Sequence, residues 1–215
     1  MSINDNNSKK LRVYLLRHGE VENASEMRVN GHKDVRLSRI GEEQMKRIAE
    51  ELCKRPIKAI FSSDLYRSRR GAELLAQKLK LKANLLPELR EMHFGEVEGL
   101  LWKDALARFG DKPAQWINWI DQRFPGGENL LDFRERVMPV YRKIILEESG
   151  EIAVFAHGGT NRIIICEELG IELKNFFILE QSYACVNIID YYQPKAKLIR
   201  LINGDISSLC TVGGI

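Results

Sequence analysis

Short apolar runs that end abruptly in a polar, glycine-containing turn recur along this chain, and a segment with helical periodicity follows each of them. The run Leu11–Leu16 ends in Arg17-His18-Gly19, and the run Ile152–Ala156 ends in His157-Gly158-Gly159. Runs of this length, partly β-branched or aromatic, favour buried strands over helices. Strands that alternate with helices predict an α/β fold: a three-layer sandwich with a mostly parallel central sheet, helices on both faces and a helical lid excursion.

The other regular elements are expected where apolar periodicity and capping residues agree. We expect helices over Glu42–Leu52 (with Ser38 as N-cap), Leu65–Leu79 and Asn161–Leu169 (closed by Gly170), and strands over Ala59–Phe61, Ala184–Tyr191 and Leu198–Ile202. Ligands of such folds bind at the carboxyl ends of the strands, and the polar turns of this chain fall at those ends. A functional site is therefore expected there.

The 215 residues are enough for a single compact domain, which we place over residues 11–205. A flexible N-terminal tail (1–10) and a C-terminal tail (206–215) are expected to flank it. The lid lies at about residues 99–130, and its tryptophans are interpreted as packing residues rather than substrate platforms. They are Trp102, Trp116 and Trp119.

The charge pattern and the cysteines limit which partners the protein can bind and in which cellular compartment it is expected. The 33 basic and 30 acidic residues are interspersed, which argues against a nucleic-acid partner. The polar segment Met1–Lys10 and the short apolar run behind it indicate neither secretion nor a membrane span. The cysteines, scattered without zinc-ligand spacing, are expected to be reduced thiols in the cytoplasm. We expect no metal and no cofactor, and a homodimer is an open possibility.

Four fragments, in this order, resemble the histidine phosphatase superfamily, the phosphoglycerate-mutase-like proteins. They are Arg17-His18-Gly19, Ser63-Asp64-Leu65-Tyr66-Arg67, Glu91 before Phe94-Gly95, and His157-Gly158-Gly159. The resemblance extends from about Leu11 to Ile202. It implies that His18 is the nucleophile, that Arg17, Arg67 and His157 hold the phosphoryl group, and that Glu91 is the proton donor.

The chemistry of these side chains suits those implied roles. A neutral imidazole at His18 is nucleophilic near neutral pH and can form a phosphohistidine. The planar forks of the two arginines match phosphoryl oxygens, and a protonated His157 would add a third cationic donor. Backbone N–H groups around Gly158 could contact the same anion. Where the family often has an asparagine six residues after the nucleophile, this chain has Ala24, so Asn23 is the candidate phosphate ligand.

Within the resemblance, the phosphatase branch fits better than the mutase branch. This chain has Phe94 and Trp102 where mutases use a tyrosine and a lysine to bind the substrate carboxylate. The segment Phe124–Asn129 is similar to α-ribazole-5′-phosphate phosphatases, so the substrate is expected to be α-ribazole 5′-phosphate or another small phosphorylated metabolite. The alternatives are a cofactor-dependent phosphoglycerate mutase and a non-catalytic module that binds a phospho-ligand.

Overall fold

A single mixed sheet forms the centre of the protein. The computed structural model describes residues 9–110, 112, 120–192 and 196–210. Within this part of the chain the sheet has the strand order β3-β2-β4-β1-β5-β6. The strands are β1 (Lys9–Arg17), β2 (Ile57–Ser62), β3 (Ala83–Leu85), β4 (Gly150–Ala156), β5 (Val186–Tyr192) and β6 (Lys197–Gly204). The pairs β1·β4, β4·β2 and β2·β3 are parallel, whereas β5 runs antiparallel to β1 and β6. The mostly parallel sheet is therefore confirmed.

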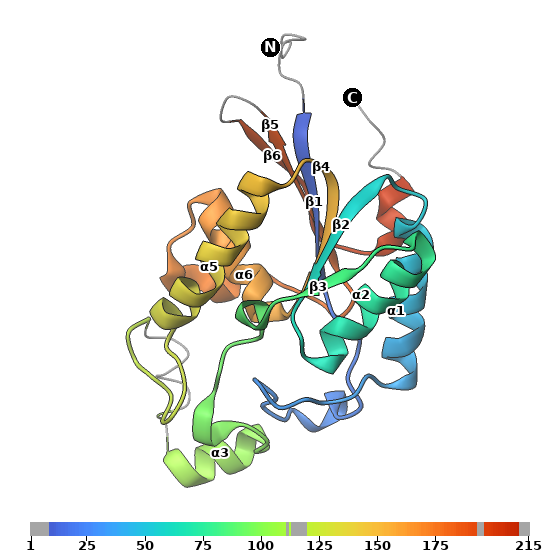
Figure 1. Cartoon of the computed structure of the whole chain (residues 1–215). Helices are drawn as coiled ribbons and strands as arrows, with labels where there is room; N and C mark the ends of the chain where they lie inside the picture. Colours follow the sequence, from blue (N-terminus) through green and yellow to red (C-terminus); the bar gives the residue numbers. More distant parts are fainter. Residues whose placement is uncertain (1–8, 111, 113–119, 193–195, 211–215) are drawn as a thin grey trace.

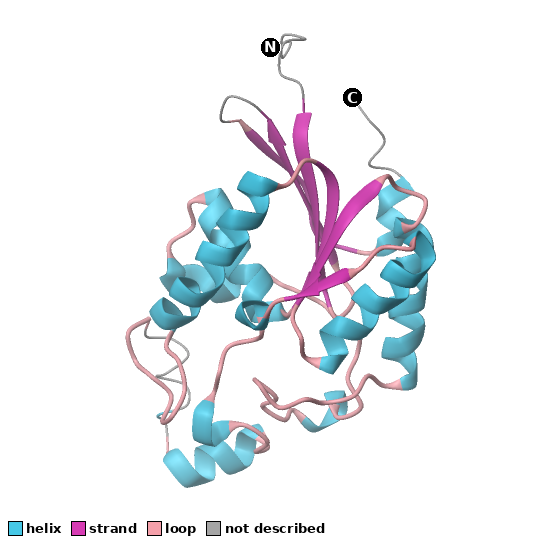
Figure 2. Ribbon diagram, in the orientation of Figure 1, coloured by secondary structure: helices cyan, strands magenta, loops and turns pink. Residues whose placement is uncertain are grey.

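Helices cover both faces of the sheet, which gives the predicted three layers (Figure 1, Figure 2). Helices α1 (Arg39–Leu52) and α2 (Tyr66–Leu79) cover one face, and α5 (Leu130–Glu147) and α6 (Gly158–Leu169) cover the other. Strand β1 shows why both faces are needed. Leu11, Val13 and Leu15 belong to the core on the α5–α6 side, whereas Tyr14 and Leu16 belong to the core on the α1–α2 side. Side chains alternate in this way because successive residues of a strand point to opposite faces.

Most predicted elements lie where the sequence places them. Ser38 caps α1, because its Oγ accepts the N–H of Gly41 at 3.0 Å. Gly170 ends α6 with a left-handed backbone, φ 70°. Strand β3 and helix α5 were not predicted from the sequence. Short 3-10 helices complete the described chain: η1 (Ala24–Glu26), η2 (Pro87–Leu89), η3 (Gly95–Val97), η4 (Leu173–Ile178) and η5 (Ile206–Cys210).

Two predicted boundaries are wrong. The first strand begins at Lys9, inside the predicted N-terminal tail. The predicted C-terminal tail is wrong over residues 206–210, which form η5. Ile206 and Leu209 are three residues apart, so one helical turn brings both against the α1–α2 core, where both are buried. Arg55 donates to the carbonyl of Leu209 at 2.9 Å and ties the turn to the domain.

The predicted lid region contains helix α3 (Trp102–Phe109), which lies beyond the carboxyl ends of the strands, away from the two main helical layers (Figure 1). Trp116 and Trp119 lie outside the described residues. Among the helices that the structure describes, we find none with the length and apolar character of a membrane span.

Candidate active site

Three parallel strands deliver polar residues to one point at their carboxyl ends. His18 follows β1, Ser63 follows β2 and His157 follows β4. Backbone hydrogen bonds hold these ends together, since His18 N–H donates to Ala156 at 3.2 Å and Ser63 N–H donates to Phe155 at 3.0 Å. A pocket of about 260 Å³ opens there. It is lined by Arg17, His18, Arg28, Val29, Asn30, Gly31, Arg67, Glu91, Phe94, Trp102 and Tyr183.

The ring of His18 is held in one tautomer. Its Nδ1 lies 2.8 Å from the carbonyl oxygen of Gly19, and a carbonyl can only accept a hydrogen bond, so Nδ1 carries the proton. In the neutral ring the lone pair is then on Nε2. Burial, followed by the charges of Arg67 and Arg17, holds the pKa of His18 well below its usual value. The imidazole is therefore neutral at neutral pH and has a nucleophilic Nε2.

Arg67 is a buried cation, only 2% exposed, although its neighbours in the sequence include two further arginines. Its guanidinium donates to the carbonyl of Gly31 at 2.6 Å and to that of Lys33 at 2.7 Å. Burial lowers the pKa of Arg67 to about 10, which leaves the group charged at neutral pH. Arg67 is therefore not a solvated charge on the surface of α2, and its place in the pocket lining fits the phosphate-binding role.

Arg17 is the last residue of β1, directly before His18, and also lines the pocket. Its guanidinium donates through Nη1 to the carbonyl of Gln181 and stacks on Tyr183, with Cζ 4.1 Å from the ring centre. Its Nε is buried and has no hydrogen-bond partner within the described chain. Buried N–H donors without a partner are rare, because their desolvation is costly. This donor is therefore available to an anion in the pocket.

His157 is fully buried and packs edge-on against His18, with ring centroids 5.1 Å apart. Its Nε2 lies 2.8 Å from Oγ of Ser63, and its buried Nδ1 has no hydrogen-bond partner among the described residues. Burial, then the charges of Arg67 and of His18, keeps the pKa of His157 well below its usual value. In the structure His157 is thus a neutral group with one free ring nitrogen, rather than a third cation.

Glu91 reaches the pocket from a loop that is far from the two histidines in sequence. One carboxylate oxygen, Oε1, accepts the N–H of Met92 at 3.0 Å, and Oε2 accepts the N–H of Gly159 at 3.0 Å. A Cβ atom at Gly159 would lie 2.1 Å from Glu91 Oε1, so only glycine allows this contact. The second glycine of the His-Gly-Gly motif thus places the carboxylate against the first turn of α6.

The two remaining candidates differ in their relation to the pocket. Gly158 is the first residue of α6 and lies beside Arg17, since a Cβ built on it would be 3.4 Å from Arg17 Nε. Asn23 is bound reciprocally to Asn30, with Nδ2–Oδ1 distances of 2.8 and 3.1 Å. Asn30 lines the pocket and Asn23 does not. The phosphate-binding roles of Asn23 and Gly158 stay predictions.

Sequence reasoning missed part of the site. Trp102 lines the pocket, contrary to its interpretation as a packing residue alone. Its alignment with a substrate-binding position of the mutase branch was the available signal. Ser63 belongs to a recognised motif, but its bond to His157 depends on two strand ends meeting. Tyr183 and Val29 come from loops and carried no signal in the sequence.

The site combines a neutral imidazole, the buried guanidinium of Arg67, the half-buried guanidinium of Arg17 and a carboxylate around one pocket. This set of groups suits a phosphoryl-transfer enzyme. Within the described residues, no three or more His, Cys, Asp or Glu side chains gather as a metal-binding group.

Comparison with known proteins defines the family. The family model of the histidine phosphatase superfamily (branch 1) matches residues 13–204, so the chain belongs to this superfamily. It is 36% identical to phosphoglycerate mutase-like protein 4 of Arabidopsis thaliana, over 94% of this chain and 88% of that protein. It is 30% identical to the glucosyl-3-phosphoglycerate phosphatase of Mycolicibacterium vanbaalenii, over 78% of each chain. The crystal structure of the alpha-ribazole phosphatase from Shigella flexneri has the same fold, with a TM-score of 0.82, 24% identity and coverage of 90% of this chain and 96% of that chain. The family and its phosphatase members identify the chain as a phosphatase.

Proposed function

We propose that this phosphatase hydrolyses small phosphate monoesters through a phosphohistidine on Nε2 of His18. The observation that carries the proposal is the state of His18: Nδ1–H is bound to the Gly19 carbonyl, and burial together with two arginines keeps the ring neutral beside the pocket. The same arginines attract a dianionic phosphoryl group. Binding of the substrate and activation of the nucleophile therefore come from one arrangement of charges.

In the first step, Nε2 attacks phosphorus, the P–N bond forms, and the bond from phosphorus to the ester oxygen breaks. Protonated Glu91 donates its proton to the departing oxygen, which leaves as an alcohol. Arg17 and Arg67 neutralise charge on the equatorial oxygens of the transferring group. If Ser63 donates its hydroxyl hydrogen to Nε2 of His157, Nδ1–H of His157 is free to donate to one of these oxygens.

In the second step, the Glu91 carboxylate takes a proton from a water molecule, whose oxygen attacks phosphorus on the phosphohistidine. The P–N bond breaks, inorganic phosphate leaves, and His18 returns to the neutral form with Nδ1–H. Glu91 is again protonated, so one water and one ester give one alcohol and one phosphate. Both side chains return to their starting states, and only the ester and one water are consumed.

The rest of the pocket indicates the class of alcohol. Val29, Phe94, Trp102 and Tyr183 line it with apolar and aromatic surface. Arg28, the other cation of the lining, already binds Glu26, with Nε 2.9 Å from Oε2. These features support a neutral, apolar or aromatic alcohol over the carboxylate of phosphoglycerate. We therefore propose α-ribazole 5′-phosphate or a similar small monoester as the substrate, in place of the mutase alternative.

The test compares wild-type protein with His18→Ala in EDTA-containing buffer, using 4-nitrophenyl phosphate and, in parallel, 3-phosphoglycerate. We expect hydrolysis of 4-nitrophenyl phosphate by the wild type, an acid-labile phosphoenzyme after rapid quenching, and loss of both in His18→Ala with an unchanged circular dichroism spectrum. Turnover by His18→Ala at the wild-type rate would exclude the covalent route. Mutase activity without hydrolysis would support the mutase alternative, and tight phosphate binding without turnover would support a binding module.

A further inference from the structure

The Phe124–Asn129 segment has no part in the chemistry described so far, yet it lies against the loop that carries the acid Glu91. Glu128 N–H donates to the carbonyl of His93 at 2.8 Å, and Glu96 N–H donates to that of Pro125 at 2.9 Å. A Cβ atom at Gly127 would lie 2.4 Å from the His93 oxygen, which requires glycine at this crossing. The segment is therefore built for close contact with the loop over residues 93–96.

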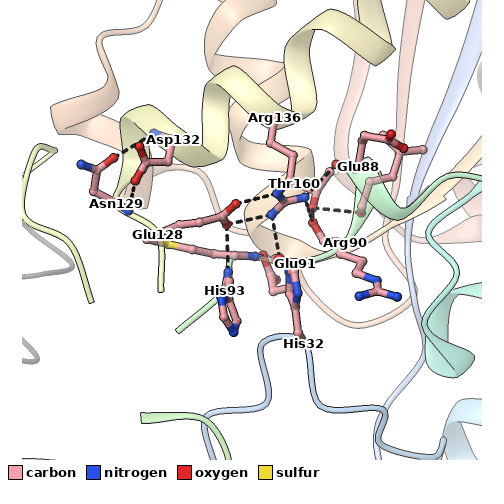
Figure 3. Close-up of polar contacts among 12 residues, drawn as sticks. His32, Glu88, Arg90, Glu91, His93, Glu128, Asn129, Asp132, Arg136 and Thr160 are labelled. Carbon is pink, nitrogen blue, oxygen red and sulfur yellow. Dashed lines mark hydrogen bonds and ion pairs between the residues drawn. The ribbon is translucent and has the colours of Figure 1, made fainter. Parts of the chain in front are cut away.

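Arg136 of α5 extends this contact to Glu91 itself. Its guanidinium binds both carboxylate oxygens of Glu128, with Nε–Oε1 2.6 Å and Nη2–Oε2 2.8 Å (Figure 3). Its Nη1 and Nη2 groups also donate to three backbone carbonyls of the loop before and at the acid. The distances are 2.8 Å to Glu88, 3.2 Å to Arg90 and 3.0 Å to Glu91. One side chain thus holds the backbone that leads to the acid and the backbone of the acid residue itself.

Arg136 and Glu128 together form a clamp on the acid loop. The clamp is largely buried, and the positive charge of Arg136 is paired with the negative charge of Glu128. The side chains of Arg136 and Glu128 are only 20% and 15% exposed. The pKa of Glu128 lies below its usual value: burial raises it, but the hydrogen bonds and charge of Arg136 lower it by more. The carboxylate also accepts the N–H of His93 at 2.9 Å, so it binds the arginine and the loop together. Bidentate pairs of this kind fix direction as well as distance.

Two further donors hold the same stretch of backbone. Nε2 of His32 donates to the carbonyl of Glu91 at 2.9 Å, and the hydroxyl of Thr160 donates to that of Arg90 at 2.9 Å. Neither reaches the full set of carbonyls that Arg136 does. The side chain of Arg90 points away to Asp64, so it takes no part in the clamp.

We propose that Arg136, oriented by Glu128, is a positioning residue that sets the place of the Glu91 carboxyl relative to the substrate's leaving oxygen. This inference rests on the proposed function of Glu91 as proton donor. Arg136 does not itself line the pocket, and it acts on Glu91 through the backbone of residues 88–91. A loss of the clamp therefore affects proton donation and leaves the phosphoryl cradle of Arg17 and Arg67 in place.

The experiment measures kcat/KM for Arg136→Lys on two substrates with different leaving groups. This parameter covers binding and the first chemical step only. Ethyl phosphate needs a proton on its strongly basic leaving oxygen, whereas 4-nitrophenolate departs without one. We expect a fall of about 10²-fold on ethyl phosphate and only a few-fold change on 4-nitrophenyl phosphate. Lysine keeps the charge but cannot reach three carbonyls and a carboxylate at once.

Arg134→Lys is the matched control. It alters an arginine on the same helix whose bidentate partner is Glu167 on α6, remote from the acid loop. We expect no difference between the two substrates in this variant. Glu128→Gln is the second test variant, because it retains the shape of the partner and removes its charge. It should show the same selective loss as Arg136→Lys, and the double variant should lose little more, since both changes break one clamp.

The outcomes distinguish a failure of the positioning role of Arg136 from a failure of the acid role of Glu91 or of the proposed function. An equal loss on both substrates in Arg136→Lys and Glu128→Gln, or no loss, overturns the positioning role. Glu91→Gln must itself show the selective loss; if it does not, Glu91 is not the acid, and the mechanism fails rather than the clamp. Absence of turnover of both substrates by the wild type would refute the proposed function and the inference with it.

Discussion

Replacing Gly159 by alanine adds one methyl group at the point where the acid meets α6. The added Cβ would lie 2.1 Å from Glu91 Oε1 and 3.0 Å from a ring carbon of Phe133. Phe133 is fully buried and cannot move far, so the carboxylate must give way. To reach an ordinary contact of 3.4 Å it has to retreat by about 1.3 Å, and it then loses the 3.0 Å hydrogen bond from Gly159 N–H.

The expected magnitude follows from that displacement. A misplacement of about 1 Å costs a catalytic group on the order of 10²-fold in rate. The effect on folding is smaller, because alanine is favoured over glycine in a helix by up to about 1 kcal/mol, which offsets part of an overpacking cost of roughly 1–3 kcal/mol. We therefore expect kcat/KM on ethyl phosphate to fall by about two orders of magnitude while the free energy of unfolding changes by no more than about 2 kcal/mol.

Gly158→Ala provides the comparison, because the same methyl group one residue earlier meets its nearest atom, Arg17 Nε, at an ordinary 3.4 Å. Steady-state kinetics on ethyl phosphate and urea unfolding of both variants would measure the two effects. The Gly158 variant should lose much less activity than the Gly159 variant. Equal activities in the two variants, or a Gly159→Ala enzyme as active as the wild type, would refute the placement of Glu91 against this glycine.

Two further perturbations test the electrostatics and the pocket. Because the pKa values of His18 and His157 are lowered in the folded state, the unfolded chain binds more protons below about pH 6.5, so stability should fall as the pH drops, by up to about 1.4 kcal/mol per pH unit for each histidine. Urea unfolding at pH 7.5 and 5.5 measures this fall, and equal stabilities would contradict it. Trp102→Ala should lower kcat/KM roughly fivefold on 4-nitrophenyl phosphate, the loss of about 1 kcal/mol of aromatic contact, with less effect on ethyl phosphate. A uniform loss on both esters would show that Trp102 supports the lid and not the substrate.

The elements that the sequence predicts correctly have strong local signals. Strand β1 is a continuous apolar run, and α1 has both a capping serine and an apolar stripe. Helix α5 was not predicted, because Pro139 lies in its interior. A proline there removes a backbone donor and argues against a helix. Its start was nevertheless visible, since Asn129 and Asp132 form a capping box with distances of 2.8 and 3.0 Å (Figure 3). Strand β3 is only three residues long, too short for any periodicity.

The candidate site likewise contains residues that local sequence patterns predict and contacts that depend on distant parts of the chain. His18 and His157 are marked by the strand before each and the glycine after it. Arg67 looks like an exposed helix residue in isolation, and only the resemblance to a family predicts its role. The contacts that orient the site, such as Ser63 to His157 and Arg136 to the Glu91 carbonyl, join residues far apart in the chain. No local pattern encodes them, because they depend on which strand ends and helices the fold brings together.

The charges of the site explain why its residues need one another. A buried arginine is costly unless its donors are satisfied, and Arg67 meets that need with the carbonyls of Gly31 and Lys33 rather than with a carboxylate. A carboxylate partner would cancel the positive field. Neutral carbonyls preserve it, so that Arg67 and Arg17 can attract a phosphoryl dianion while, together with burial, they hold the pKa of His18 low and its ring neutral. Glu91, the carboxylate in the pocket lining, is bound to backbone N–H groups instead. The Glu91 carboxylate therefore acts on Arg67 only through its charge across the pocket, while the guanidinium donors of Arg67 are taken up by neutral carbonyls.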